Sequence, residues 1–456
     1  MQGKKLTLTG LFVLMVMLTM SFTAFATTKM YSVSDPAPWQ RVECWASDLT
    51  NMKNGQEPIL KISLPTNDKV RGWLPSDIFV TDGYSSTYDD YDFGAYGHLK
   101  SNKYFLLGYG PNWQNATRTR PVLLVHGAAD DINRAWTHPL VAQTPDTIEN
   151  PGLMQYLSNQ GFAVFAISFP HTQGNNLIQG QLIREAINVI KSRTGADKVD
   201  IVAHSKGNIA SISYMSSMNN EYNNMNWLTD YQGDVGKYVA IAAPFKGVDT
   251  MFRYYTANTS VIDQNSNCPV AFEDAYIYYS YRDYHRWDMT DTYDKNYFQG
   301  QTQLLHNWVE DPDHPIYFNS ESATGTDWNA TRNALYYGGS SYYVSSEGID
   351  QAIADPSSTS GTSYFIEKMN NRGINPYIDV HVLYGTKEAM TYMWWYPIGE
   401  KADDSDSVVF VASATHTSGI ARRGADIVAK KGMYLNHVEL TREPEAMQWI
   451  KDALTY

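Results

Sequence analysis

The stretch Val199-Asp-Ile-Val-Ala-His-Ser-Lys-Gly207 decides the fold class of this 456-residue chain. Its first five residues are typical of a buried β-strand, and the apolar residues that follow at 209, 212 and 215 have the spacing of a helix. A sharp strand-to-helix turn needs small residues two before and two after its central serine, because strand and helix approach closely there. Gly207 meets this need and Ala203 is a tolerable substitute, so the pattern predicts that Ser205 is an exposed nucleophile.

The predicted turn is a place where negative charge is stabilised. Backbone N–H groups at a helix N-terminus lack partners, and the helix dipole favours negative charge there. We expect two N–H groups to face an oxyanion at Ser205: that of Lys206, and that of Ala128, which follows Gly127 after the apolar run 121–125. The Lys206 side chain should point away or pair with a carboxylate. The alternative role for Ser205 is a helix N-cap.

Two histidines beside these segments are interpreted as structural. His204 is the neighbour of the serine, at the end of the predicted strand, and we expect it to be buried. His126 precedes Gly127 and resembles a general base, but in this position we expect it to shape the loop by hydrogen bonding.

Strand and helix patterns alternate along the central part of the chain. Continuous apolar runs are typical of strands buried on both faces of a parallel sheet, and the helical patterns between them place helices on both faces. The predicted strands are 121–125, 162–168, 199–203, 238–243 and 379–385, with weaker candidates at 408–411 and 433–435 and two N-terminal strands at 60–64 and 77–80. The predicted helices are 150–161, opening on Asn150 and Pro151, then 183–195, 209–215 and 443–454.

A serine nucleophile needs a base, and the base needs a carboxylate that orients it. In this fold class the chain order is serine, acid, histidine. Asp406 stands directly before an apolar run after the 379–385 strand and is our first choice of acid, with Asp404 and Asp403 left open as alternatives. His437, just before the closing helix, is preferred as base over His416, while His381 precedes the acid and is expected to be a strand residue.

Composition and charge narrow the class of protein. Hydrophobic residues make up 43% and charged residues 18%, as in ordinary globular proteins. The net charge of −13 repels phosphate backbones, so we expect no nucleic-acid partner. Cys44 and Cys268 are too few for a disulfide scaffold, and whether they pair is left open. There is no metal-ligand spacing such as His-Glu-x-x-His, so no metal and no cofactor are expected.

The N-terminus has the pattern of a secretory signal peptide. Lys4 and Lys5 precede an apolar run at 11–18, and small residues at Ala24 and Ala26 are those that a signal peptidase reads. The alternative is a membrane anchor, but the strongly apolar stretch is shorter than the ~20 residues that a bilayer requires. We therefore expect cleavage after about Ala26 and a secreted, extracellular protein.

Two polar segments interrupt the alternation. Residues 82–94 contain Asp89, Asp90 and Asp92; these could bind calcium, but without regular ligand spacing a solvated acidic loop is the preferred interpretation. Residues 251–372 are polar and rich in tyrosine, which is typical of an insertion. Its tyrosines either contact a substrate or simply pack the insertion.

Together these motifs resemble the α/β-hydrolase superfamily, and more narrowly the secreted bacterial lipases and polyester depolymerases. The resemblance is carried by the run Pro121-Val-Leu-Leu-Val-His-Gly127, the elbow 203–207, Ala242-Ala243-Pro244-Phe245-Lys246-Gly247, the segment 406–409 and Leu435-Asn436-His437. In such lipases a glycine usually follows the acid, whereas Ser407 stands here. The resemblance covers about 116–250 and 373–456, and the insertion falls where these lipases often carry a lid.

The resemblance implies an α/β-hydrolase fold, with a mostly parallel sheet between two layers of helices. We expect a signal peptide at 1–26, a β-rich N-terminal extension at 27–115, the hydrolase core at 116–250 and 373–456, and a Tyr-rich lid or cap at 251–372. The implied function is a secreted serine carboxylic-ester hydrolase acting on a lipid, small ester or polyester. Transient contact with a membrane or lipid interface is compatible with this function. A polyester depolymerase or acyltransferase would use the same triad. A catalytically inactive, hydrolase-like binding protein is the alternative of another class.

Overall fold

The computed structural model describes residues 39–46, 60–62, 104–128, 130–137, 152–169, 174–221, 229–250, 300, 303–308, 311–316, 365–393 and 396–456. Several predictions fall outside these ranges and stay predictions: the signal peptide, the strand at 77–80, the acidic loop at 82–94, Cys268 and most of the Tyr-rich insertion.

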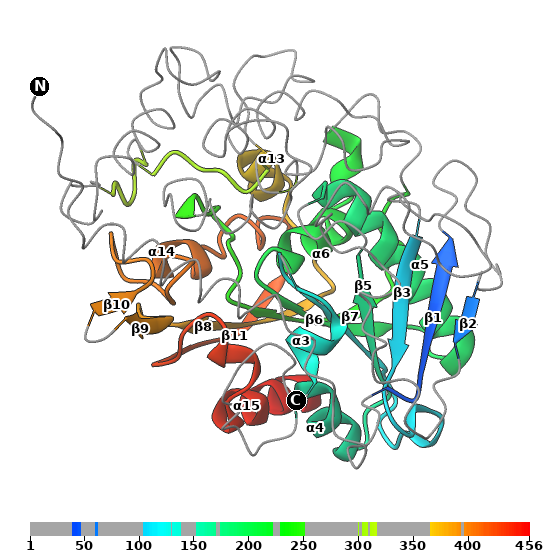
Figure 1. Cartoon of the computed structure of the whole chain (residues 1–456). Coiled ribbons are helices and arrows are strands. Elements are labelled where there is room, and N and C mark those ends of the chain that lie inside the picture. The colour runs from blue at the N-terminus through cyan, green and yellow to red at the C-terminus, as the bar shows by residue number, and fades with distance from the viewer. Residues whose placement is uncertain are drawn as a thin grey trace, which may run out of the picture.

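A single sheet of nine described strands forms the centre of the molecule (Figure 1). Six neighbouring strands are parallel, and three N-terminal ones continue the sheet in antiparallel pairing. In order across the sheet the strands are β11 (Asp426–Met433), β8 (Asp379–Gly385), β7 (Val235–Ile241), β6 (Val199–His204), β4 (Val122–Val125), β5 (Val164–Ser168), β3 (Tyr104–Tyr109), β1 (Arg41–Ala46) and β2 (Leu60–Ile62). A second, two-stranded sheet pairs β9 (Thr391–Met393) with β10 (Tyr396–Ile398).

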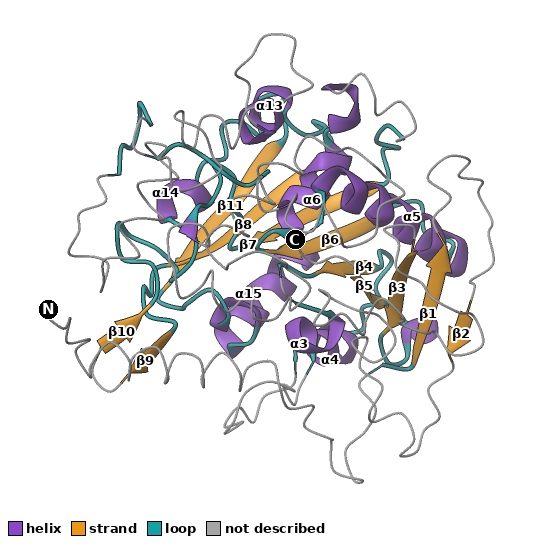
Figure 2. Cartoon of the chain, turned by 45° about the horizontal axis from the view of Figure 1, so that its top comes forward, coloured by secondary structure: helices purple, strands orange, loops and turns teal. Residues whose placement is uncertain are grey.

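Helices cover both faces of the large sheet, as Figure 2 shows. Because β4, β5, β6 and β7 are buried along their whole length, each face needs a covering layer. One layer contains α5 (Asn176–Thr194), α6 (Gly207–Met215) and α13 (Phe365–Arg372). The other contains α3 (Ile132–Trp136), α4 (Leu153–Asn159) and α15 (Pro444–Thr455). The chain therefore has the α/β-hydrolase fold that the sequence predicts.

The N-terminal strands of the 27–115 segment are part of the same sheet. β3 runs antiparallel beside β5, and β1 beside β3. Trp45 and Phe105 from these strands pack into the same hydrophobic cluster as α5. The segment thus extends the core across its β5 edge.

Four sequence-based predictions of elements were wrong in position or kind. The helix predicted at 183–195 begins seven residues earlier, because α5 runs over Asn176–Thr194. The helix predicted to open on Asn150 and Pro151 begins at Leu153 with Gly152 as its N-cap. The apolar run at 408–411 forms bends that lead into α14 (Val411–Ala414) and no strand. Of the strand predicted at 433–435, only Met433 belongs to β11, which begins at Asp426 and consists mostly of exposed or half-buried residues. Short 3-10 turns complete the described elements, namely η3 (Trp113–Asn115), η4 (Met218–Glu221) and η6 (Glu439–Thr441).

None of the helices in the described part of the chain is long and apolar enough to span a bilayer.

Candidate active site

Ser205 occupies a strained turn between β6 and α6. Its φ of 52° lies in the left-handed region, which few non-glycine residues adopt. Its N–H donates to the carbonyl of Ile241 at 3.0 Å, so the pairing of β6 with β7 continues one residue past the strand. A Cβ on Gly207 would lie only 2.4 Å from the carbonyl oxygen of His126, which explains why this position is a glycine.

A buried asparagine that the sequence analysis did not single out braces this turn. The Nδ2 of Asn208 donates to the carbonyls of Ser205 and Ile241, both at 2.9 Å. Its Oδ1 accepts a hydrogen bond of 2.7 Å from the hydroxyl of Tyr238 on β7. Both side chains are fully buried. The only sequence signal was an asparagine in the first turn of the predicted helix.

Asp406 and His437 form a hydrogen-bonded pair. The Nδ1 of His437 lies 2.9 Å from Oδ2 of Asp406, and the His437 peptide N–H donates to the Asp406 carbonyl at 2.7 Å. The other carboxylate oxygen accepts from the backbone N–H groups of Val408 and Val409 at 3.1 and 2.8 Å. These hydrogen bonds fix the buried Asp406 carboxylate from both sides. Because a carboxylate accepts hydrogen bonds, the neutral His437 ring carries its proton on Nδ1.

The alternative acids have other contacts. Asp403 pairs with the ring of His314 near the surface, and the described contact of Asp404 is its carbonyl, which accepts from the N–H of Val411 at 2.8 Å. Of the three aspartates, Asp406 is the one whose carboxylate faces the His437 ring in the described part of the chain. This geometry favours Asp406 over Asp403 and Asp404 as the partner of His437.

His204 connects the serine turn to the histidine loop. It is buried, as expected, and its Nε2 lies 2.9 Å from the carbonyl oxygen of His437. The two imidazole rings are 4.7 Å apart between centroids. Burial and the charge of His437 hold the pKa of His204 well below its ordinary value, so the ring is neutral and donates from Nε2. Ser205 after β6, Asp406 beside the end of β8 and His437 after β11 therefore lie at the same end of the sheet.

The two predicted oxyanion donors belong to residues on either side of the serine turn. Lys206 follows Ser205 directly as the N-cap residue of α6, and Ala128 is half-buried, one residue past Gly127 in the loop after β4. Gly127 touches the serine closely enough that an added Cβ would meet the Ser205 Cβ at 2.8 Å. The buried Lys206 ammonium donates to Oε1 of Gln179 on α5 at 2.5 Å.

The remaining histidines have structural or separate positions. His126 accepts at Nε2 from the N–H of Phe169 at 3.2 Å, so its proton is on Nδ1 and faces the Gly127 carbonyl at 2.8 Å; it shapes the loop. His381 lies in β8, with its ring edge-on to that of Trp449.

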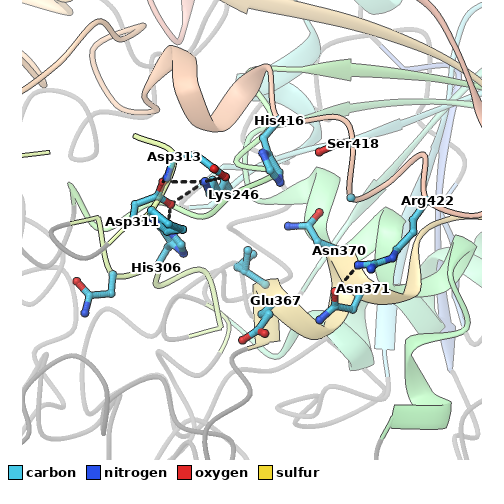
Figure 3. Close-up of a pocket in the computed structure, with 14 residues that line it drawn as sticks. Lys246, His306, Asp311, Asp313, Glu367, Asn370, Asn371, His416, Ser418 and Arg422 are labelled. Atoms are coloured by element: carbon cyan, nitrogen blue, oxygen red, sulfur yellow. Dashed lines mark hydrogen bonds and ion pairs between the residues drawn. The ribbon is translucent and has the colours of Figure 1, made fainter. Parts of the chain in front are cut away.

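A polar pocket of about 580 Å³ lies apart from this constellation (Figure 3). His416 lines it together with Lys246, His306 and Asp311. The buried Asp311 accepts from Lys246 Nζ at 2.7 Å and from His306 Nε2 at 2.6 Å, so these charges satisfy one another. None of Ser205, Asp406 and His437 lines this pocket. Within the described residues, no group of three His, Cys, Asp or Glu side chains is placed to hold a metal ion.

Comparison with solved structures gives several distant matches. The lipase BlEst2 of Bacillus licheniformis in its propeptide form is 11% identical, with 77% of this chain and 53% of that chain covered and a TM-score of 0.38. Its mature form is 13% identical over 78% and 99% of the two chains, with a TM-score of 0.35. A thermostable carboxyl esterase from Bacillus coagulans is 9% identical over 78% and 94%, with a TM-score of 0.37. This chain thus spans about half the length of the propeptide form.

The family model gives the assignment. The model described as lipase (class 2) matches residues 119–419, which is well over half of the chain. That range begins just before β4, includes Ser205 and Asp406, and ends before His437. The chain belongs to the class 2 lipases.

Proposed function

We propose that this protein is a secreted serine esterase or lipase in which Ser205, His437 and Asp406 form the catalytic triad. The observation that carries the proposal is the buried 2.9 Å pair of His437 Nδ1 and Asp406 Oδ2, together with a serine held at φ 52° in the turn after β6. A carboxylate that fixes the proton on Nδ1 leaves Nε2 free of a proton, which is the form of imidazole that can act as a base.

In the acylation step, Ser205 Oγ attacks the ester carbonyl carbon while His437 Nε2 takes the hydroxyl proton. The carbonyl oxygen becomes an oxyanion, which the N–H groups of Lys206 and Ala128 stabilise. Each such donor contributes about 3–4 kcal/mol in serine hydrolases. When the tetrahedral intermediate collapses, the ester C–O bond breaks, the imidazolium gives its proton to the departing alkoxide, and an acyl-serine ester remains.

In the deacylation step, water takes the place of the alcohol. His437 removes a proton from the water, whose oxygen attacks the acyl carbon, and the proton then passes to Ser205 Oγ as the carboxylic acid leaves. Asp406 stays ionised throughout and stabilises the imidazolium formed in both steps. If an alcohol replaced water, the same residues would carry out acyl transfer, so product analysis decides between hydrolase and acyltransferase.

The proposed substrates are lipids, small esters or polyesters. Class 2 lipase membership supports an ester substrate, while contact with a lipid interface and a polymeric substrate belong to the proposal. Secretion is proposed from the N-terminal pattern, with Thr27 as the first residue of the mature chain. Mass spectrometry of protein recovered from the culture medium tests this, because an intact Met1 end would contradict it.

The decisive experiment compares Ser205→Ala with Ser213→Ala. Ser213 lies on the same helix and donates to the carbonyl of Ile209, away from the turn. We expect Ser205→Ala to lower turnover of p-nitrophenyl esters by at least about 10⁴-fold, while Ser213→Ala and the wild type remain active. A fluorophosphonate should label the wild type at Ser205.

An inactive binding protein with a hydrolase fold would give neither turnover nor labelling. Retained activity in Ser205→Ala would place the nucleophile elsewhere. A panel of esters of increasing acyl length, together with a polyester film, then identifies the substrate class.

A further inference from the structure

We propose that His204 is a positioning residue that holds the backbone of His437 at a fixed place relative to Ser205. The inference rests on the proposed triad and goes beyond it, because His204 takes no part in the proposed proton transfers. His204 connects the proposed nucleophile and base, because it precedes Ser205 in the chain and its side chain hydrogen-bonds to His437.

Three hydrogen bonds hold His437, and each comes from a different group. Its ring Nδ1 faces Asp406 Oδ2 at 2.9 Å, and its peptide N–H donates to the Asp406 carbonyl at 2.7 Å. Its own carbonyl accepts from His204 Nε2 at 2.9 Å. The first two bonds relate the base to the acid. The third connects the base to β6, the strand that leads to Ser205.

The position of His204 is fixed independently of His437. It is the last residue of β6, paired in register with Ile241 of β7. Its ring meets that of Trp136 edge-on, with centroids 6.5 Å apart, and Trp136 is fully buried in α3. A donor on a central strand, with its ring packed against the core, gives the His437 loop a rigid reference point.

The neutral state of His204 suits this role. A carbonyl accepts only from a protonated nitrogen, so the bond requires the Nε2–H tautomer. Burial, reinforced by the nearby His437, keeps the pKa of His204 well below its ordinary value. During turnover His437 becomes a cation 4.7 Å away, between ring centroids. A neutral neighbour donates its hydrogen bond without repelling that cation.

The test uses two variants of similar size. In His204→Gln the side-chain amide keeps an N–H donor near the original Nε2, whereas in His204→Met a side chain of similar length has no donor. We expect the Met variant to lose about 10- to 100-fold in kcat, with KM within about twofold, because displacing a catalytic group by a fraction of an ångström has effects of this size. The Gln variant should recover most of that loss.

Fluorophosphonate labelling gives a second readout. Labelling needs an activated Ser205 but no ester binding, so its rate should fall in the Met variant by the same factor as kcat and recover in the Gln variant. Unfolding by urea and near-UV circular dichroism check that both variants are folded. Should His204→Met not fold, His204→Phe replaces it as the donorless partner, since it keeps a ring against Trp136.

The outcomes separate this inference from the proposed function. Equal kcat and labelling rates in the folded Gln and donorless variants would overturn the positioning role. If instead the wild type itself is not labelled at Ser205, the triad fails and the positioning role fails with it. Loss in the donorless variant with recovery in the Gln variant supports both.

Discussion

Gly207→Ala should disable the site through a single added methyl group. Gly207 is the first residue of α6, and the helix begins here directly against the loop that follows β4. A Cβ at this position would lie 2.4 Å from the carbonyl oxygen of His126 and 2.8 Å from that of Val125. Both contacts are with backbone, so no side-chain rotation relieves them.

The size of the effect follows from the overlap. Real Cβ atoms keep at least about 3.0 Å from other heavy atoms, so the His126 carbonyl and Gly207 must separate by at least 0.6 Å. The chain runs from His126 directly through Gly127 to the proposed oxyanion donor Ala128, so that shift moves the donor relative to Ser205. A displacement of this order corresponds to a loss of about 10- to 100-fold in kcat, together with about 1–3 kcal/mol of overpacking in the free energy of unfolding.

Gly233→Ala is the matched control. Gly233 has φ +73° in an exposed turn before β7, where nothing lies within 4 Å of an added Cβ. The substitution should cost about 1 kcal/mol through the left-handed backbone alone and leave kcat unchanged. Urea unfolding and p-nitrophenyl ester kinetics on both variants separate the two effects. If Gly207→Ala kept the wild-type kcat while folded, the close packing of helix and loop would not set the site geometry.

Three further outcomes follow from the same contacts. Asp406→Asn should lower kcat by about 10⁴-fold, because an amide orients His437 wrongly, whereas Asp403→Asn should change it less than about twofold in the same ester assay. Ser407→Gly should raise the free energy of urea unfolding by about 1 kcal/mol, because Ser407 has φ 84° and its buried hydroxyl has no partner among the described residues. The pKa of folded His204 is lowered, so below about pH 6.5 the unfolded chain binds a proton at this residue that the folded state excludes. The free energy of unfolding of the wild type, measured with urea at pH 5 and 7, should therefore fall relative to that of His204→Gln by up to about 1.4 kcal/mol per pH unit.

The sequence predicted the central strands well because their burial is uniform. The predicted strand at 379–385 coincides with β8, Asp379–Gly385, and the apolar runs of β4, β5 and β6 lie within a few residues of their predicted bounds. The edge strand β11 was underestimated because exposed and half-buried residues, including Lys430 and Lys431, fill most of it. An edge strand has one partner and one covered side, so its pattern is weak.

The strand predicted at 408–411 does not form, because hydrogen bonds of the candidate active site use its backbone. The N–H groups of Val408 and Val409 donate to the Asp406 carboxylate, so they have no need of a neighbouring strand. The same bonds hold the carboxylate that faces His437. The apolar pattern therefore predicted a strand where the Asp406 side chain, in place of a neighbouring strand, accepts the backbone hydrogen bonds.

The sequence predicted few of the side-chain contacts between residues that are far apart in the chain. Chain order pointed to Asp406 and His437, and the structure brings these two together. Nothing in the sequence indicated that the Asn208 side chain would bridge two carbonyls or that His204 would bond to the His437 carbonyl 233 residues away. Such contacts depend on where loops return to the sheet, which propensities and periodicity do not encode.

The strained residues show what sets the position of the nucleophile. Of the five described non-glycine residues with positive φ, Ser205 follows β6, Ala242 follows β7 and Ser407 follows the acid. A left-handed conformation costs about 1–2 kcal/mol, so it persists where neighbours fix the backbone. The N–H of Ser205 donates to Ile241 at 3.0 Å, and that of Ala242 donates to Leu383 at 2.9 Å. Each strand thus clamps the residue just beyond its neighbour's end, and the pairing of β6, β7 and β8 holds the turn at Ser205 in its strained form before any substrate is present.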